Sequence, residues 1–370
     1  MTRIRILVVD DSVVIRKLLS DTLSEDRALE VIGVASDGRI AMAKIAQLKP
    51  DLITLDVEMP VMNGLETLAA VRALYPKLPV IMFSTLTEHG AAATLDALSL
   101  GASDYATKPS NTGSAEVAIE RIRTDLIPKI KALCGFTRSK LQALPRTHPP
   151  LKAHPLANSR IDIVAIGTST GGPNALAEVL PRIPEDFPVP IVVVQHMPPI
   201  FTRLLAERLA SRSAIAVEEG SAGAILSPGR AWIAPGNFHM KVVRGGMSAR
   251  LNLNQAPPEN SCRPAVDVLF RSVAAAYGAN VLAVVMTGMG ADGVLGAQDI
   301  RDAGGEVIIQ DEASSVVWGM PGLVHASGLD VAAYPLDRLG SEITRRVLHS
   351  RGGFSPVETK TFAASESPAK

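Results

Sequence analysis

The chain has 370 residues, and its 37 basic and 37 acidic side chains give a formal net charge of zero. This balance excludes the broadly basic surface of a non-specific nucleic-acid binder, and the two cysteines exclude both a disulfide framework and a four-thiolate zinc site. Hydrophobic residues make up 47% of the chain, but no apolar run approaches the roughly 18 residues that cross a bilayer. We therefore expect a cytoplasmic protein of two domains, with aliphatic cores and no membrane insertion.

Short β-branched runs alternate with helix-like segments over residues 1–130. The runs lie at residues 5–9, 30–35, 51–57, 79–85 and 104–108. Strands that alternate with helices form βαβ crossovers, and these crossovers produce a parallel sheet. The first 130 residues are therefore predicted to form one doubly wound α/β domain.

Polar side chains stand where several of these strands end. Three are the carboxylates Asp10, Asp11 and Asp56, and Ser84 and Lys108 stand at the ends of later strands. Carboxylates that converge on one sheet edge repel one another unless a hard divalent cation such as Mg²⁺ joins them. The lysine and the hydroxyl would neutralise and hydrogen-bond an incoming phosphoryl group.

These residues resemble the motifs of response-regulator receiver domains, which have a flavodoxin-like fold. The resemblance rests on Asp10-Asp11, Ser84-Thr85, Lys108-Pro109 and the segment 55–64. It implies that Asp56 accepts a phosphoryl group from a histidine kinase. It further implies a cis Lys108–Pro109 peptide. The implied Mg²⁺ ligands are Asp10, Asp11, Asp56 and the main-chain carbonyl of Glu58, and the implied switch residues are Ser84, Tyr105 and Lys108.

The alternating pattern breaks at residues 131–159 and again at residues 350–370. The first stretch combines lone cations with several prolines, and this composition is typical of an extended linker. A short helix is expected to continue into it, to about Leu144. A plain solvated tether is the simpler interpretation of the linker, and a docking strip for an acidic partner is the alternative. The second stretch has no periodicity and is expected to be a disordered tail.

Strand and helix patterns return over residues 160–349. The apolar runs lie at residues 162–167, 190–195, 231–235, 281–288 and 306–310. Residues 240–253 surround a turn at Gly245-Gly246 and predict an antiparallel hairpin. The second half is therefore predicted to be a Rossmann-like, doubly wound domain with a small hairpin.

A glycine-rich turn, Gly167–Gly172, follows the first of these strands and contains Ser169. Such a strand–turn–helix segment leaves a serine hydroxyl accessible at a sharp turn, as a nucleophile requires. The helix start behind it offers free N–H groups to a developing oxyanion. Glycine-rich turns also bind phosphates, so nucleotide binding is the alternative.

The next strands distinguish these two functions. A dinucleotide-binding domain places an acid at the end of the second strand, whereas this chain has His196 there. Asp292 follows a later strand, between glycines. Ser169, His196 and Asp292 would meet at one sheet edge as nucleophile, base and orienting acid. The rival bases are His239 and His325, and the rival acids are Asp267 and Asp299.

This half is similar to the catalytic domain of the chemotaxis protein-glutamate methylesterases. The similarity is carried by Gly167–Gly172, the segments 195–199, 233–240 and 263–270, and the run around Asp292. It implies hydrolysis of glutamate methyl esters on methyl-accepting chemoreceptors, with methanol released and receptor glutamines also deamidated. It implies no cofactor for the esterase. The implied catalytic residues are Ser169, His196 and Asp292, supported by Thr170 and by the main-chain N–H of Met289.

Two other outputs are weaker interpretations. One is a receiver joined to a non-hydrolytic, nucleotide-binding signalling domain, which the missing ribose-binding acid disfavours. The other is a DNA-binding response regulator. The second half shows no helix-turn-helix pattern and no basic excess, so no nucleic-acid partner is expected.

Overall fold

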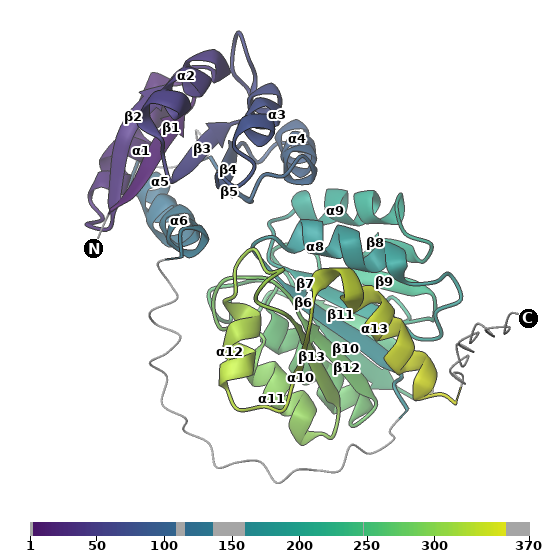
Figure 1. Ribbon diagram of the computed structural model, residues 1–370. Helices are drawn as coiled ribbons and strands as arrows, with labels where there is room; N and C mark the ends of the chain where they lie inside the picture. The colour runs from purple at the N-terminus through teal and green to yellow at the C-terminus, as the bar shows by residue number, and fades with distance from the viewer. Residues whose placement is uncertain (1–2, 109–114, 136–159, 247, 353–370) are drawn as a thin grey trace, which may run out of the picture.

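The computed structural model describes residues 3–108, 115–135, 160–246 and 248–352. These residues form the two α/β domains that the sequence predicts (Figure 1). The linker helix near Leu144, the tail beyond Gly352 and the peptide between Lys108 and Pro109 lie outside the described residues. The first residues expected in the tail are instead held by the domain: Ser350 Oγ accepts the N–H of Ile161 at 3.0 Å, and Arg351 donates to Asp162 at 2.6 Å.

The N-terminal domain is a five-stranded parallel sheet in the order β2-β1-β3-β4-β5. All five predicted strands are present, and their ends agree with the expected positions to within one residue. Both faces of the sheet are covered by helices, so β3 and β4 are fully buried, as parallel strands usually are. The elements are β1 (Ile4–Val9), α1 (Val13–Ser24), β2 (Leu29–Ala35), α2 (Gly38–Leu48), β3 (Leu52–Asp56), α3 (Gly64–Leu74), β4 (Val80–Ser84), α4 (Glu88–Ser99), β5 (Asp104–Thr107), α5 (Ala115–Arg121), the π-helical η1 (Ile122–Leu126) and α6 (Ile127–Leu133).

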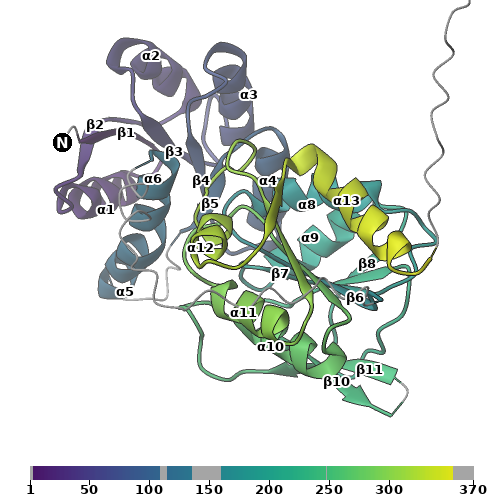
Figure 2. The same cartoon turned by 60° about the horizontal axis from the view of Figure 1, so that its bottom comes forward.

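The C-terminal domain is a seven-stranded sheet in the order β14-β13-β12-β6-β7-β9-β8, and every pair in it is parallel. The predicted hairpin forms a separate two-stranded sheet and projects from the edge of the domain (Figure 2). The elements are β6 (Ile163–Thr168), α8 (Gly172–Val179), the 3₁₀-helical η2 (Leu180–Arg182), β7 (Ile191–Gln195), α9 (Phe201–Ala210), β8 (Ala216–Glu219), β9 (Arg230–Ile233), β10 (His239–Gly245), β11 (Ser248–Asn254), α10 (Val266–Tyr277), β12 (Val281–Val285), α11 (Val294–Asp302), β13 (Glu306–Gln310), α12 (Met320–Ala326), β14 (Ala332–Tyr334) and α13 (Leu336–His349).

The first strand of this domain, β6, lies in the middle of its sheet. After β6 the chain adds β7 on one side of β6, and it later adds β12 on the other side of β6. Loops at such a switch of direction diverge and leave a crevice at the carboxyl ends of the strands. The loops after β6, β7 and β12 therefore form the natural place for a site.

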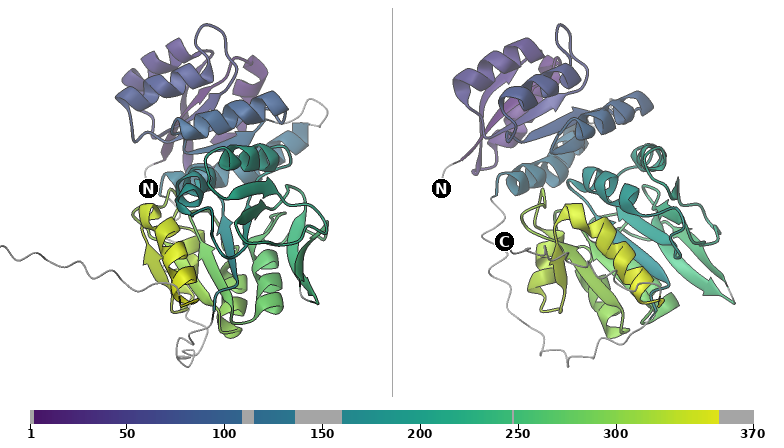
Figure 3. Two further views of the ribbon diagram at one scale, coloured as in Figure 1. Left: turned by 90° about the vertical axis from the view of Figure 1, so that its right-hand side faces the viewer. Right: turned by 45° about the vertical axis from the view of Figure 1, so that its right-hand side comes forward.

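The two domains contact each other through helices. Helix α4 of the N-terminal domain lies against α8 and α9 of the C-terminal domain (Figures 1 and 3). One apolar core includes buried side chains of both domains, among them Leu98 and Phe201. In the part of the chain that the structure describes, no helix is both long and apolar enough to cross a membrane.

Candidate active site

Ser169 stands in the turn between β6 and α8, as its sequence context predicts. Its main-chain N–H donates to the carbonyl of Thr287 at 3.0 Å, which ties the turn to the end of β12. Gly171 adopts φ = +78°, a conformation that costs glycine little. Ser169 remains partly exposed.

Gln195 holds the backbone of this turn in position. Its amide Nε2 donates to the carbonyl of Ser169 at 3.0 Å and to that of His196 at 3.3 Å. A Cβ atom at position 172 would lie 1.9 Å from Gln195 Oε1, so a residue other than glycine would displace this amide. Sequence reasoning did not identify Gln195 as a positioning residue, although it directly precedes His196.

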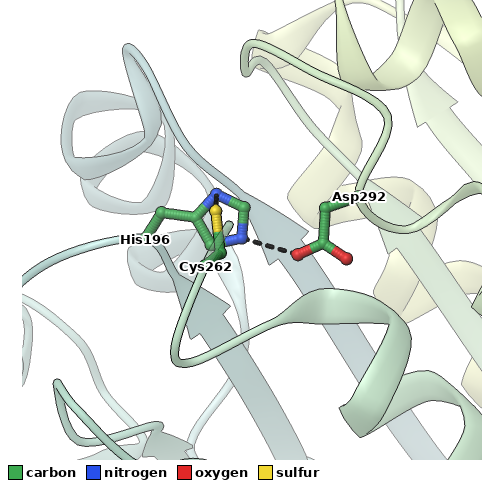
Figure 4. Close-up of side chains that lie close together, drawn as sticks. All are labelled: His196, Cys262 and Asp292. Carbon is green, nitrogen blue, oxygen red and sulfur yellow. Dashed lines mark hydrogen bonds and ion pairs between the residues drawn. The ribbon is translucent and has the colours of Figure 1, made fainter. Parts of the chain in front are cut away.

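His196 and Asp292 form a hydrogen-bonded pair. The imidazole Nε2 lies 2.8 Å from Asp292 Oδ2 (Figure 4). The parallel register of β6 and β7 pairs Thr168 with Gln195, so the residues that follow them, Ser169 and His196, lie on neighbouring strand ends. The structure therefore brings together, at one sheet edge, the three residues that the sequence predicts.

Asp292 is surrounded by hydrogen-bond donors. The main-chain N–H groups of Val266 and Asp267 donate to it at 2.6 and 2.9 Å, and Asn260 Nδ2 donates at 2.9 Å. Burial alone would raise the pKa of Asp292, but these donors and His196 outweigh burial and lower it. The carboxylate is therefore ionised and accepts the Nε2–H of His196, so that in the neutral ring Nδ1 is the nitrogen with the free lone pair.

Cys262 occupies the other side of the imidazole. Its Sγ lies 3.6 Å from His196 Nδ1 (Figure 4). Burial disfavours the charged imidazole, but the hydrogen bonds to Asp292 and Cys262 outweigh it and raise the pKa of His196 to about 10. Among the described residues, no hydrogen bond joins Ser169 Oγ to this ring. Catalytic contacts of this kind often tighten only when substrate is bound.

The rival residues have other partners. His239 is buried and makes a 3.0 Å hydrogen bond with the carbonyl of Pro257, whereas His325 lies beside the ring of Trp318. Asp299 lies 3.6 Å from Arg271. Asp267 accepts the N–H groups of Gly293 and Gly296, so it holds the loop that carries Asp292 without touching His196.

The two predicted supporting residues lie close to the N-terminal domain. Thr170 does not hydrogen-bond His196 in the described part of the chain; its Oγ1 instead donates to Asp104 Oδ2 at 2.8 Å. Met289 lines a cavity of about 500 Å³ together with residues of α1, η1 and α6. The main-chain N–H of Met289 has no hydrogen-bond acceptor among the described residues, so it is free to bind an oxyanion.

The N-terminal domain has a second polar site at the carboxyl end of its sheet. Ligand atoms of Asp10, Asp11 and Asp56 lie within 4.8 Å of one another. Lys108 Nζ lies 2.9 Å from Asp10 and 2.7 Å from Asp56, and a cavity of about 140 Å³ opens beside them, lined also by Glu58 and Ser84. Burial, together with the charge of Asp10, raises the pKa of Asp56 to about 6.

Two of the predicted switch residues, Ser84 and Tyr105, have partners in different domains. Ser84 is buried, and its Oγ donates to the carbonyl of Gly90 at 3.0 Å. Tyr105 is also buried, and its ring stacks on Phe201 of the other domain with centroids 4.8 Å apart and planes at 11°. Tyr105 therefore forms part of the contact between the two domains.

Polar contacts surround this aromatic stack. Lys129 Nζ donates to the carbonyl of Tyr105 at 2.8 Å and lies 3.9 Å from Asp104, the acceptor of the Thr170 hydroxyl. Around the edge, Asn174 Nδ2 donates to the carbonyl of Leu98 at 2.7 Å. Two ion pairs join α4 to α9, Glu88–Arg203 at 2.7 Å and Asp96–Arg208 at 2.8 Å. The residue that follows Ser169 is thus tied directly to the N-terminal domain.

Comparisons with known proteins identify a known family in each half of the chain. The family model for the CheB methylesterase matches residues 164–343, and the model for the response regulator receiver domain matches residues 6–120. A protein-glutamate methylesterase/protein-glutamine glutaminase of Trichodesmium erythraeum is 54% identical over 351 residues, which cover 94% of this chain and 100% of the relative. A Nocardioides relative of the same name is 51% identical and covers 96% of this chain and 99% of its own. The solved Thermotoga maritima CheB methylesterase catalytic domain is 41% identical, over 50% of this chain and 98% of that one, with a TM-score of 0.49.

Fold, site and matches together define a response regulator whose output domain is a hydrolase. The chain belongs to the family of the protein-glutamate methylesterases/protein-glutamine glutaminases. The nucleotide-binding alternative finds no support in these similarities.

Proposed function

We propose that this protein hydrolyses glutamate methyl esters on methyl-accepting chemoreceptors, deamidates receptor glutamines, and does so through Ser169, His196 and Asp292. The observation that carries the proposal is the hydrogen bond between His196 Nε2 and the ionised carboxylate of Asp292. His196 follows β7, the strand that pairs with β6, and Ser169 follows β6. We divide the chain into a receiver (1–130), a linker (131–159), an esterase (160–349) and a tail (350–370). The start of β6 at Ile163 and the end of α13 at His349 support the bounds of the esterase, whereas α6 continues past residue 130 and ends at Leu133.

The reaction begins when Nδ1 of His196 takes the proton of Ser169 Oγ as that oxygen attacks the ester carbonyl. The contact between Cys262 Sγ and Nδ1 must first break, so that the serine hydroxyl can hydrogen-bond to Nδ1. The main-chain N–H of Met289 is the proposed donor to the oxyanion. The imidazolium returns its proton to the departing methoxide, or to the amide nitrogen of a glutamine, which leaves as ammonia. Water then hydrolyses the acyl-enzyme and releases a receptor glutamate.

The receiver would control this reaction through phosphorylation of Asp56 by a histidine kinase. Three carboxylates and one ammonium leave a charge of −2 at the site, which a divalent cation balances. Asp10, Asp11, Asp56 and the carbonyl of Glu58 would hold Mg²⁺, which when bound spreads the charge of the transferring phosphoryl group. Lys108 lies against Asp56 and would pair with the phosphoryl oxygens.

Contacts between the domains support obstruction of the esterase by the unphosphorylated receiver. Asp104 accepts the hydroxyl of Thr170 beside the nucleophile, and the adjacent Tyr105 stacks on Phe201. A phosphoryl group on Asp56 adds nearly two negative charges and can reorder β4, β5 and the loops that follow them. That reordering would release the contacts of Asp104 and Tyr105 and open the Ser169 turn.

Methanol release from receptor membranes with methylated glutamates tests the proposal. We expect the rate to rise when Mg²⁺ and a small phosphodonor are added. In Asp56→Asn the basal rate should remain while the stimulation disappears, because an amide cannot accept the phosphoryl group. Absence of methanol from folded wild-type protein under every condition would refute the esterase, and stimulation that survives in Asp56→Asn would refute the acceptor.

Reversing one ion pair between the domains tests the obstruction separately. Arg208→Asp places two acids opposite each other in α9 and α4, so the closed arrangement should weaken. Basal methanol release should rise about twofold to fivefold, the size expected for loss of a partly solvated ion pair. The matched control is the double variant with Asp96→Arg, which restores the attraction with the charges exchanged and should return to the basal rate. A rise that persists in the double variant would show that Arg208 acts in some other way.

A further inference from the structure

Cys262 faces the nitrogen that the reaction needs as its base. The Sγ–Nδ1 distance to His196 is 3.6 Å, and Nε2 of the same ring is held by Asp292 (Figure 4). Donor atoms of His196, Cys262 and Asp292 all lie within 4.8 Å of one another. Thiolate, imidazole and carboxylate together are the donor set that proteins use for zinc.

The separation of the sulfur and nitrogen atoms suits a bound metal ion. Zinc binds sulfur at about 2.3 Å and imidazole nitrogen at about 2.0–2.1 Å, and two such bonds at a tetrahedral angle place the donors about 3.6 Å apart. The 3.6 Å between Cys262 Sγ and His196 Nδ1 therefore matches the donor separation of a bound ion. A hydrogen bond between a thiol and an imidazole nitrogen has a similar length. Either a shared proton or a metal ion can therefore lie between Cys262 Sγ and His196 Nδ1.

Asp292 completes the arrangement from the far side of the ring. Histidines that bind metals usually donate their other ring N–H to a carboxylate, which fixes the tautomer and makes the ligating nitrogen more basic. Asp292 accepts the N–H of His196 in this way and is itself held by main-chain donors. Nδ1 is thus the ring nitrogen that remains for an incoming cation.

We propose that His196 and Cys262 bind a thiophilic divalent cation of the zinc type, and that the bound ion inhibits the esterase. The ion displaces the thiol proton, and the Nδ1 proton of the charged ring, to solvent; it forms one bond to the thiolate and one to Nδ1, and completes its shell with water. No oxidation or reduction takes place. The inhibition rests on the proposed function, because an ion on Nδ1 occupies the lone pair that would accept the proton of Ser169.

Cobalt(II) provides a readout that does not depend on activity. The full-length protein is titrated with Co²⁺ in excess Mg²⁺, so that the receiver carboxylates are already occupied, and the near-ultraviolet sulfur-to-cobalt charge-transfer band is recorded. The chain has one other cysteine, Cys134, whose thiol pKa is raised to about 12 by burial and by Asp51. We expect the band in the wild type and in the matched control Cys134→Ser, and no band in Cys262→Ser or Cys262→Ala.

Zinc inhibition of methanol release is measured in the same variants, each relative to its own metal-free rate. Loss of one ligand should raise the half-inhibitory zinc concentration at least about tenfold in Cys262→Ser, whereas Cys134→Ser should match the wild type. A band that is absent, or that survives loss of Cys262, would overturn the site. A Cys262-dependent band without zinc inhibition would overturn the placement of the ion on the base nitrogen. A metal-free protein that releases no methanol but shows the band would instead refute the proposed function.

Discussion

Replacing Ser169 with alanine is expected to lower the rate of methanol release by about a factor of 10⁶, because loss of a nucleophile from a Ser-His-Asp set removes nearly all catalysis by the set. The residual rate would come from the oxyanion donors and from substrate binding. The change removes one partly exposed hydroxyl, so the fold should be unaffected. Methanol release with saturating phosphodonor measures the effect.

Thr168→Ala is the matched control for this variant. Thr168 is the residue before the nucleophile, and its hydroxyl is buried and donates to the carbonyl of Thr287 at 2.9 Å. Alanine there should leave the rate within a few-fold of wild type, although it should lower stability by about 1 kcal/mol. Ser169→Ala protein that is folded and retains a substantial share of the rate would show that another residue is the nucleophile.

Replacing Asp292 with asparagine is expected to lower kcat by about four orders of magnitude. The asparagine amide can donate to Nε2, and this would place the ring proton on Nδ1. In that tautomer His196 cannot accept the proton of Ser169. Methanol release under single-turnover conditions measures the loss.

Asp267→Asn separates this electronic effect from loss of structure. Asp267 is also buried, and it accepts main-chain N–H groups of the loop that carries Asp292, but it does not touch His196. Its asparagine variant keeps a carbonyl oxygen for these donors, so the rate should stay within about tenfold of wild type while the unfolding temperature falls. Equal losses of rate in the two variants would argue that Asp292 acts only by holding the loop.

Sequence periodicity predicted most of the fold because parallel strands buried on both faces appear as unbroken apolar runs. β6 and β12 are strands of this kind, and every residue in them is buried. The predictions missed β8 and β14, which are short strands at the two edges of the sheet and carry exposed residues. Edge strands lack the apolar run, so their pairing depends on tertiary contacts that a local pattern does not contain.

The site was predictable to the extent that it follows from strand ends. His196 and Asp292 were placed correctly because parallel topology brings the carboxyl ends of β7 and β12 to one edge. The sequence did not predict that Cys262 and Asn260 contact the site. They lie in an irregular loop before α10, in which Asn260 and Ser261 have positive φ, and such a loop has no local pattern that places its side chains. The partner of Thr170 was also unforeseen, since Asp104 belongs to the other domain.

The stack of Tyr105 on Phe201 makes the coupling between the domains reciprocal. If docking of the esterase favours the receiver conformation in which Tyr105 lies against Phe201, thermodynamic linkage requires docking to oppose phosphorylation by the same free energy. If the receiver obstructs the crevice as proposed, a receptor helix at Ser169 would compete with docking and would therefore favour phosphorylation of Asp56. Abundant methylated substrate would in this way increase the fraction of active enzyme at a constant supply of phosphodonor.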